Sequence, residues 1–120
     1  MQCYRDLMVW QQGIELVTEV YRISRQLPDA ERFALSNQMQ RAAVSIPSQI
    51  AEGHARSSRR EFLSYLSMAL GSLAELETHL TIADKLDYIT EGKKRKVMSQ
   101  AGLLGRRIRS LQKSLQQKAD

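Results

Sequence analysis

Three kinds of side chain in this 120-residue sequence could do chemistry: two histidines, one cysteine and clustered arginines and lysines. A metal pair in a helical protein is commonly held by two Glu-x-x-His motifs, but His79 follows Glu75 by four residues and Glu77 by two. Cys3 stands apart from His54 and His79, and no Gly-rich phosphate loop occurs. We therefore predict no catalytic site, no metal site and no cofactor, and we expect His79 on a solvated helix surface.

The positive charge is concentrated in the last quarter of the chain. Residues 1–91 contain 9 Lys/Arg and 12 Asp/Glu, whereas residues 92–120 contain 9 Lys/Arg and one Asp. On a helix, four of these cations fall on one outer stripe that faces away from the apolar positions and that we take to be free of acids. A local positive field of this kind attracts polyanions, so the stripe is predicted to contact the phosphates of a nucleic acid. The stripe consists of Arg95, Arg106, Arg109 and Lys113, and the cluster at 93–96 extends it.

A second basic group, Arg56, Arg59 and Arg60, falls at a predicted turn between helices. In an up-down bundle this turn and the 93–96 cluster lie at opposite ends, so we expect two separate patches. Aromatic residues make up only 6% of the chain, which argues against recognition of unstacked bases. A surface that serves only solubility stays open as the alternative.

Glu52 is the acidic residue whose position is most informative. It lies near the end of a predicted helix, where the partial negative charge of the helix terminus disfavours a carboxylate. We expect a compensating contact with the amides that open the next helix or with Arg56, Arg59 or Arg60. A catalytic carboxylate is the alternative.

Four segments that could position these residues have apolar side chains spaced by three and four, which predicts helices. The first covers about residues 6–27, the second 29–52, the third about 28 residues from Ser58, and the fourth the residues after Thr90. Asp29, Ser58 with Glu61, and Thr90 are predicted N-caps. The sequence therefore predicts one all-α domain over residues 1–120, an antiparallel up-down-up-down four-helix bundle.

Proline and glycine positions refine this expected bundle. Pro47 lies inside the second helix and predicts a kink between Ala43 and Pro47. Gly53 is expected to end that helix in the left-handed conformation, and Gly71 to mark the close approach of another helix. The first helix has two adjacent apolar seams, one through Trp10 and one through Leu16, which together exceed what one bundle core needs. Part of this face is therefore available to another subunit.

The composition indicates a globular protein in water. The apolar fraction is 42%, the charged fraction is 26%, and no run of 18 apolar residues occurs. The first residues also lack the layout of a signal peptide. We therefore expect a cytoplasmic protein with no membrane segment.

Residues 38–53, which read Gln-Met-Gln-Arg-Ala-Ala-Val-Ser-Ile-Pro-Ser-Gln-Ile-Ala-Glu-Gly, carry a family resemblance together with Arg56, Glu61-Phe62 and 69–75. This pattern resembles the four-helix bundle family of 23S ribosomal RNA intervening-sequence proteins. It departs from that family at Gln49, where the pattern usually has Asn. The match nearly covers the chain, and structural roles are expected for five of its residues: Arg41, Pro47, Glu52, Gly53 and Gly71.

The resemblance implies a bundle that assembles into a ring-like homopentamer with a positively charged surface suited to nucleic acid. The chain is also similar to the accessory bundle protein of diversity-generating retroelements, which works beside a reverse transcriptase. Our first hypothesis is a non-enzymatic oligomer that binds nucleic acid, with RNA favoured over DNA. The second is a protein-interaction scaffold whose basic face meets an acidic protein partner.

Overall fold

The computed structural model describes residues 3–117, and within that range every regular element is helical. Each long helix is amphipathic in sequence, with its apolar side chains spaced for one face. The four α helices are α1 (Met8–Ser24), α2 (Leu35–His54), α3 (Arg59–Lys85) and α4 (Glu91–Gln117), and two short 3-10 helices are η1 (Tyr4–Asp6) and η2 (Asp29–Glu31).

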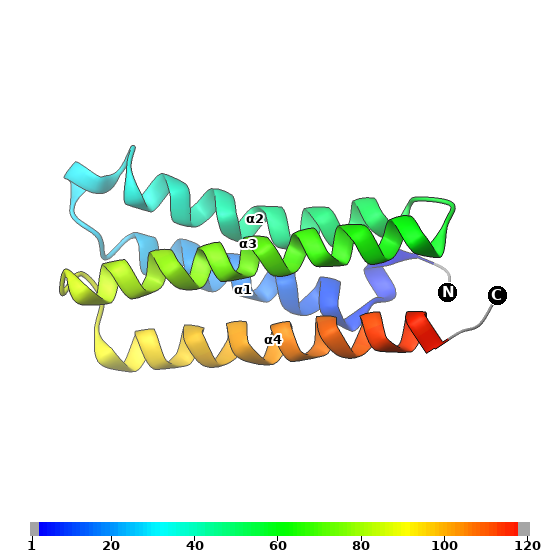
Figure 1. Ribbon diagram of the computed structural model, residues 1–120. Coiled ribbons are helices and arrows are strands. Elements are labelled where there is room, and N and C mark those ends of the chain that lie inside the picture. Colours follow the sequence, from blue (N-terminus) through cyan, green and yellow to red (C-terminus); the bar gives the residue numbers. More distant parts are fainter. Residues whose placement is uncertain (1–2, 118–120) are drawn as a thin grey trace.

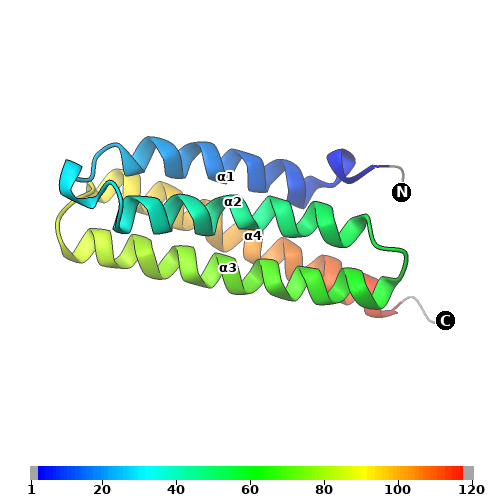
Figure 2. The ribbon, with the colours of Figure 1, turned by 90° about the horizontal axis from the view of Figure 1, so that it is seen from above.

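The helices run up, down, up and down as an elongated bundle of 50 × 23 × 20 Å (Figure 1). Each helix packs against the next one in the chain, and α1 also packs against α4, which closes the ring of helices. Figure 2 shows the same antiparallel order from above, with α2 between α1 and α3. The predicted architecture is confirmed.

The core is formed by one apolar face from each helix. The apolar side chains spaced by three and four along α3 are all buried: Phe62, Leu66, Ala69, Leu73, Leu76, Leu80 and Ala83. Those of α2 are buried as well: Leu35, Met39, Ala42, Ala43, Ile46 and Ile50. In α4, Val97, Ala101, Leu104 and Ile108 are buried, and Leu111 and Leu115 are half-buried against the core. The largest fully buried side chains come from all four helices: Leu16, Val20, Ile23, Met39, Ile46, Ile50, Leu66, Leu76, Leu80, Val97, Leu104 and Ile108.

The two apolar seams of α1 differ in burial. The seam through Val9, Leu16 and Ile23 is buried in the core. The seam through Trp10 is only partly covered: Trp10 itself is half-buried, while Ile14 and Tyr21 are exposed. The apolar surface of α1 therefore exceeds what the core covers, as the two seams predicted, because one seam already fills the space between α2 and α4.

The start of α2 differs from the prediction at Asp29. Residues 29–31 form η2 instead of the first turn of α2, which begins at Leu35. The Glu31 carboxylate accepts a hydrogen bond from the Leu35 amide at 3.4 Å and another from the Tyr88 hydroxyl at 3.1 Å. The side chain that satisfies the Leu35 amide thus lies two residues past the expected cap, and no α2 amide among the described residues bonds to Asp29.

The glycines of the interior were placed wrongly from the sequence. Gly53 lies inside α2, with no glycine of the described chain at positive φ, and a Cβ added there would lie 2.4 Å from Tyr65 Cβ. Gly71 is exposed, and a Cβ added there meets nothing within 4 Å. Close helix approach therefore occurs at Gly53 and not at Gly71, because the apolar face of α3 points away from Gly71.

Pro47 lies within an unbroken α2 and packs against α1, where a Cβ added at Gly13 would lie 3.2 Å from Pro47 Cβ. The kink stays a prediction.

Two of the predicted N-caps are confirmed. Ser58 Oγ accepts a hydrogen bond from the Glu61 amide at 3.0 Å, and α3 begins at the following residue. Thr90 Oγ1 accepts from the Lys93 amide at 3.4 Å at the start of α4. These caps fix where both long helices begin, and so they set the register of the cations that follow.

Candidate nucleic-acid interface

The outer face of α4 presents a row of exposed cations, Arg106, Arg109 and Lys113. Their spacing places them within about 60° around the helix axis and within about 10 Å along it. No salt bridge joins any of the three to another residue between 3 and 117. Their charge is therefore available to an external anion.

Both arginines of this row lie near glycines of α4. A Cβ added at Gly102 would lie 3.5 Å from Nη1 of Arg106, and one added at Gly105 would lie 3.5 Å from Nη1 of Arg109. Each guanidinium thus lies along the helix near the glycine four residues before it. Gly105 is buried, and its added Cβ would also lie 3.1 Å from Leu73 Cδ2, so Arg109 lies beside the contact between α3 and α4.

Arg95, predicted as part of the same stripe, is not free. Its Nη2 lies 3.3 Å from Oε2 of Glu91, which shares this outer face one turn earlier. The expectation of an acid-free stripe is therefore wrong at its first turn, because a spacing of four residues returns a side chain to the same side of the helix.

The lysines beside Arg95 are also largely compensated. Lys94 Nζ lies 3.1 Å from Asp84, and Lys96 Nζ lies 3.5 Å from the buried carboxylate of Glu19, which Arg22 contacts as well. These pairs tie the start of α4 to α3 and α1. The first turn of α4 is therefore largely neutralised. Four other cations at the same end are exposed and join no salt bridge among residues 3–117: Arg25, Arg32, Lys85 and Lys93.

The second basic group lies at the other end of the bundle, beside the last turns of α4 (Figure 1). The Arg59 guanidinium donates a hydrogen bond to the carbonyl oxygen of Leu115 at 3.2 Å, and the Gln112 amide donates to Ser67 Oγ at 3.0 Å. Arg60, the next residue after Arg59, is exposed. The α2–α3 group and the C-terminal half of α4 thus meet at one end, which the sequence interpretation did not foresee. We call these five cations the basic edge: Arg59, Arg60, Arg106, Arg109 and Lys113.

Arg56 is occupied by structural contacts, in contrast to its neighbours. Its guanidinium donates to the Tyr65 hydroxyl at 2.6 Å, lies 5.0 Å from the centre of the Tyr65 ring and pairs with Glu52 at 3.4 Å. Tyr65 in turn donates to Glu52 at 3.3 Å, and Arg56 also reaches Glu61. The contact expected between Glu52 and a nearby arginine is confirmed, and Arg56 acts mainly as a clamp on the α2–α3 turn.

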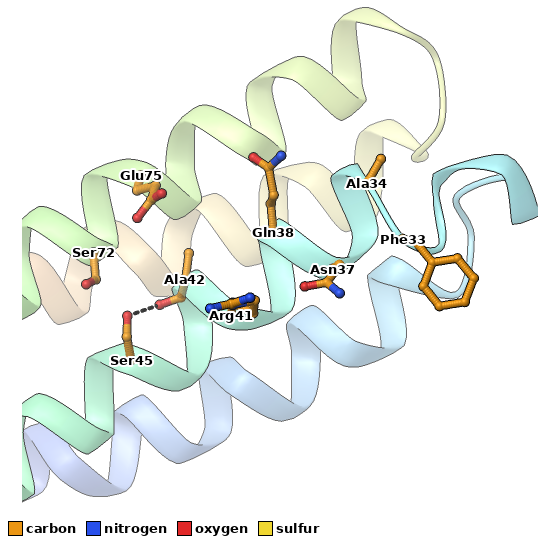
Figure 3. Close-up of a pocket in the computed structure, with 9 residues that line it drawn as sticks. All are labelled: Phe33, Ala34, Asn37, Gln38, Arg41, Ala42, Ser45, Ser72 and Glu75. Carbon is orange, nitrogen blue, oxygen red and sulfur yellow. Dashed lines mark hydrogen bonds between the residues drawn. The ribbon is translucent and has the colours of Figure 1, made fainter.

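A groove of about 610 Å³ lies between α2 and α3 (Figure 3), and none of its lining residues belongs to the basic edge. Arg41 stands on its α2 wall and Glu75 on its α3 wall, and no salt bridge joins them. The other polar lining residues are neutral amides and hydroxyls. The charges of Arg41 and Glu75 sum to zero, so the groove has no net positive charge and does not extend the candidate nucleic-acid interface.

His79 is buried, with 6% of its surface exposed, so the expectation of a solvated histidine is wrong. Its Nδ1 has no hydrogen-bond partner among the described residues. No group of three metal-ligating side chains occurs between residues 3 and 117. Nor is any helix in that range long and apolar enough to cross a bilayer.

The fold and the basic edge define the class: an all-α bundle protein with a cationic surface at one end. The family model of the 23S rRNA-intervening sequence protein matches residues 5–110, so the chain belongs to this family. The predicted family is thereby confirmed.

A crystal structure of a protein of unknown function from the S23 ribosomal protein family of Bacteroides thetaiotaomicron has a similar fold, with a TM-score of 0.82 and 23% sequence identity. The match covers 88% of this chain and 99% of that one. No protein with a curated description matches this chain significantly.

Proposed function

We propose that this chain is a non-enzymatic, cytoplasmic RNA-binding protein that contacts phosphates through the basic edge. The observation that carries the proposal is the uncompensated row of Arg106, Arg109 and Lys113 beside Arg59 and Arg60. The chain belongs to the family of the 23S rRNA-intervening sequence protein, and this association with an RNA favours RNA over DNA. Contacts of this kind position a phosphate backbone and carry little sequence information, so binding is weakly sequence-specific.

The proposal narrows the candidate residues that the sequence indicated. Arg95 contributes less to phosphate binding, because it forms a salt bridge with Glu91. Arg56 contributes less as well, because Glu52 and Tyr65 occupy its guanidinium. The proposed interface is therefore the basic edge, where the exposed cations of α3 and α4 lie side by side.

We also propose that the protein works as a homo-oligomer, a ring-like pentamer. Ile14, Tyr21 and Val44 are each about 40% exposed, and Tyr21 and Val44 line the same depression between α1 and α2. Exposed apolar side chains grouped in this way favour burial against another chain. A ring would repeat the basic edge and multiply weak phosphate contacts. Light scattering of the purified protein tests this, and a monomer at micromolar concentration would contradict it.

A fluorescence anisotropy titration with a structured RNA at two salt concentrations tests the RNA proposal. The Arg106→Gln/Arg109→Gln variant should bind weakly, with the salt slope reduced by about 1.8 for each chain that contacts the RNA. The matched control is Arg25→Gln/Lys85→Gln, which removes the same charge from two exposed positions at the opposite end. Equal loss in both double variants would contradict a role for the basic edge.

The second candidate is a scaffold whose basic edge binds an acidic protein. The groove that Met8, Arg107 and Leu111 line between α1 and α4 favours it, because an apolar floor beside one arginine suits an acidic amphipathic segment. A pull-down with and without nuclease separates the candidates. A complex that survives nuclease supports the scaffold, and one that is lost supports RNA.

A further inference from the structure

Resting on the proposed RNA-binding function, we infer that the basic edge binds the backbone of double-stranded RNA and not unpaired strands. Proteins that hold single strands combine cations with exposed aromatic rings on which bases stack. Duplexes are bound through phosphates and shape, without such rings. The distribution of aromatic side chains around the basic edge therefore distinguishes the two substrates.

The basic edge has no aromatic ring available for stacking. No Phe, Trp or Tyr occurs between Glu91 and Gln117, so α4 contributes none. Near the start of α3, Phe62 is buried, and Tyr65 is held by Arg56 and Glu52 on the side of α3 that meets α2. Bases of an unpaired strand would find cations there and nothing to stack on.

The other rings belong to η1, α1 and the α1–α2 connection, and Trp10 and Tyr4 lie at the same end of the bundle as the basic edge (Figure 1). Tyr21 is 40% exposed on α1, and Phe33 is 83% exposed in the α1–α2 connection. Trp10 is half-buried and packs edge-on against Tyr4, with 5.3 Å between ring centres. These rings are not part of the basic edge, because its five residues belong to α3 and α4.

The rigidity of the row of Arg106, Arg109 and Lys113 also favours a duplex over a single strand. Arg106, Arg109 and Lys113 are fixed on one helix, within about 10 Å along its axis. A duplex presents its phosphates in a rigid array, so it loses little conformational freedom when it meets a rigid row. A single strand must be ordered on binding, and stacking does not offset that cost here.

The test compares an RNA hairpin and an oligouridylate, both of about 30 nucleotides, long enough for a stem of about 12 base pairs. Anisotropy should show the hairpin bound about tenfold more tightly at equal salt, because the single strand gains no stacking. Trp10 fluorescence should stay unchanged in both complexes. Phe33→Ala should leave hairpin affinity within about twofold, as expected for a ring outside the interface.

The outcomes separate this inference from the proposed function. Oligouridylate binding as tight as the hairpin, with quenched Trp10 emission or with loss of affinity in Phe33→Ala, overturns the duplex inference and leaves RNA binding intact. Equal binding of both RNAs without these signatures also overturns it. Failure of both RNAs to bind overturns the proposed function itself.

Discussion

Arg59, the first residue of α3, donates a hydrogen bond to the carbonyl oxygen of Leu115 in the last turns of α4, 56 residues later in the chain. The last carbonyls of a helix have no partner within it, and they carry partial negative charge. A guanidinium at this position therefore satisfies a free acceptor and a helix dipole together. The same contact holds the α4 row beside Arg60.

Replacing Arg59 with Met should loosen the end of α4. The Met side chain keeps the apolar stem but cannot donate to Leu115, and we expect a loss of about 1 kcal/mol in the free energy of unfolding. Urea denaturation measures this loss, and amide exchange should rise in the last turns of α4. Arg60→Met is the matched control, expected to change stability by less than about 0.5 kcal/mol. Equal stability of both variants would show that the Leu115 contact contributes nothing.

Gly53→Ala and Gly71→Ala should have opposite effects on stability. At Gly53 the added methyl would lie 2.4 Å from Tyr65 Cβ, so α2 and α3 must separate, at a cost of about 3 kcal/mol. At Gly71 the methyl meets nothing within 4 Å, and alanine should stabilise the exposed helix by about 1 kcal/mol.

Thermal unfolding at fixed protein concentration measures both glycine variants. Light scattering on Gly71→Ala adds a control for assembly. If Gly71→Ala destabilises the protein and the oligomer is lost, a helix of another subunit packs against α3 at Gly71. The close helix approach predicted from the sequence would then occur between subunits and not within the chain.

Most of the fold could be predicted, because apolar spacing and capping residues act locally. The α3 seam from Phe62 to Ala83 is buried as expected, and Ser58 caps the helix it precedes. The start of α2 was missed because Glu31 bonds Tyr88, 57 residues away, and no local pattern encodes that contact. Gly53 was misread for a similar reason: a glycine near a helix end can serve either a turn or a neighbouring helix.

The candidate site was predicted in part. The outward position of Arg106, Arg109 and Lys113 follows from helical geometry and is confirmed by their exposure. The position of Glu91 on the same face was available from its spacing to Arg95 and was overlooked. The junction of Arg59 with α4 depends on the antiparallel register of α3 and α4, which sequence spacing alone does not set.

The hydrogen bond between Tyr88 and Glu31 predicts a dependence of stability on alkaline pH. Bonding to the Glu31 carboxylate, then burial, then the carboxylate charge raise the pKa of Tyr88 above 10.0. Because the folded chain holds the phenol proton more tightly, the contribution is fully present below pH 10 and is lost as pH rises through the raised pKa. Urea midpoints from pH 8 upward should fall more steeply for the wild type than for Tyr88→Phe. Parallel curves would contradict the coupling.

Arg56 and Arg60 lie four residues apart on either side of the same turn, yet we expect their loss to have different consequences. Arg56→Gln removes the contacts with Glu52 and Tyr65, so unfolding should become easier by about 1 kcal/mol while RNA affinity changes little. Arg60→Gln should leave the urea midpoint unchanged and lower the salt slope of RNA binding by about 0.9 per bound chain, because it removes one phosphate contact. Urea denaturation and anisotropy titration on both proteins measure the two effects. The assignment fails if Arg56→Gln reduces the salt slope as much as Arg60→Gln does, since a clamped guanidinium would then be binding phosphate.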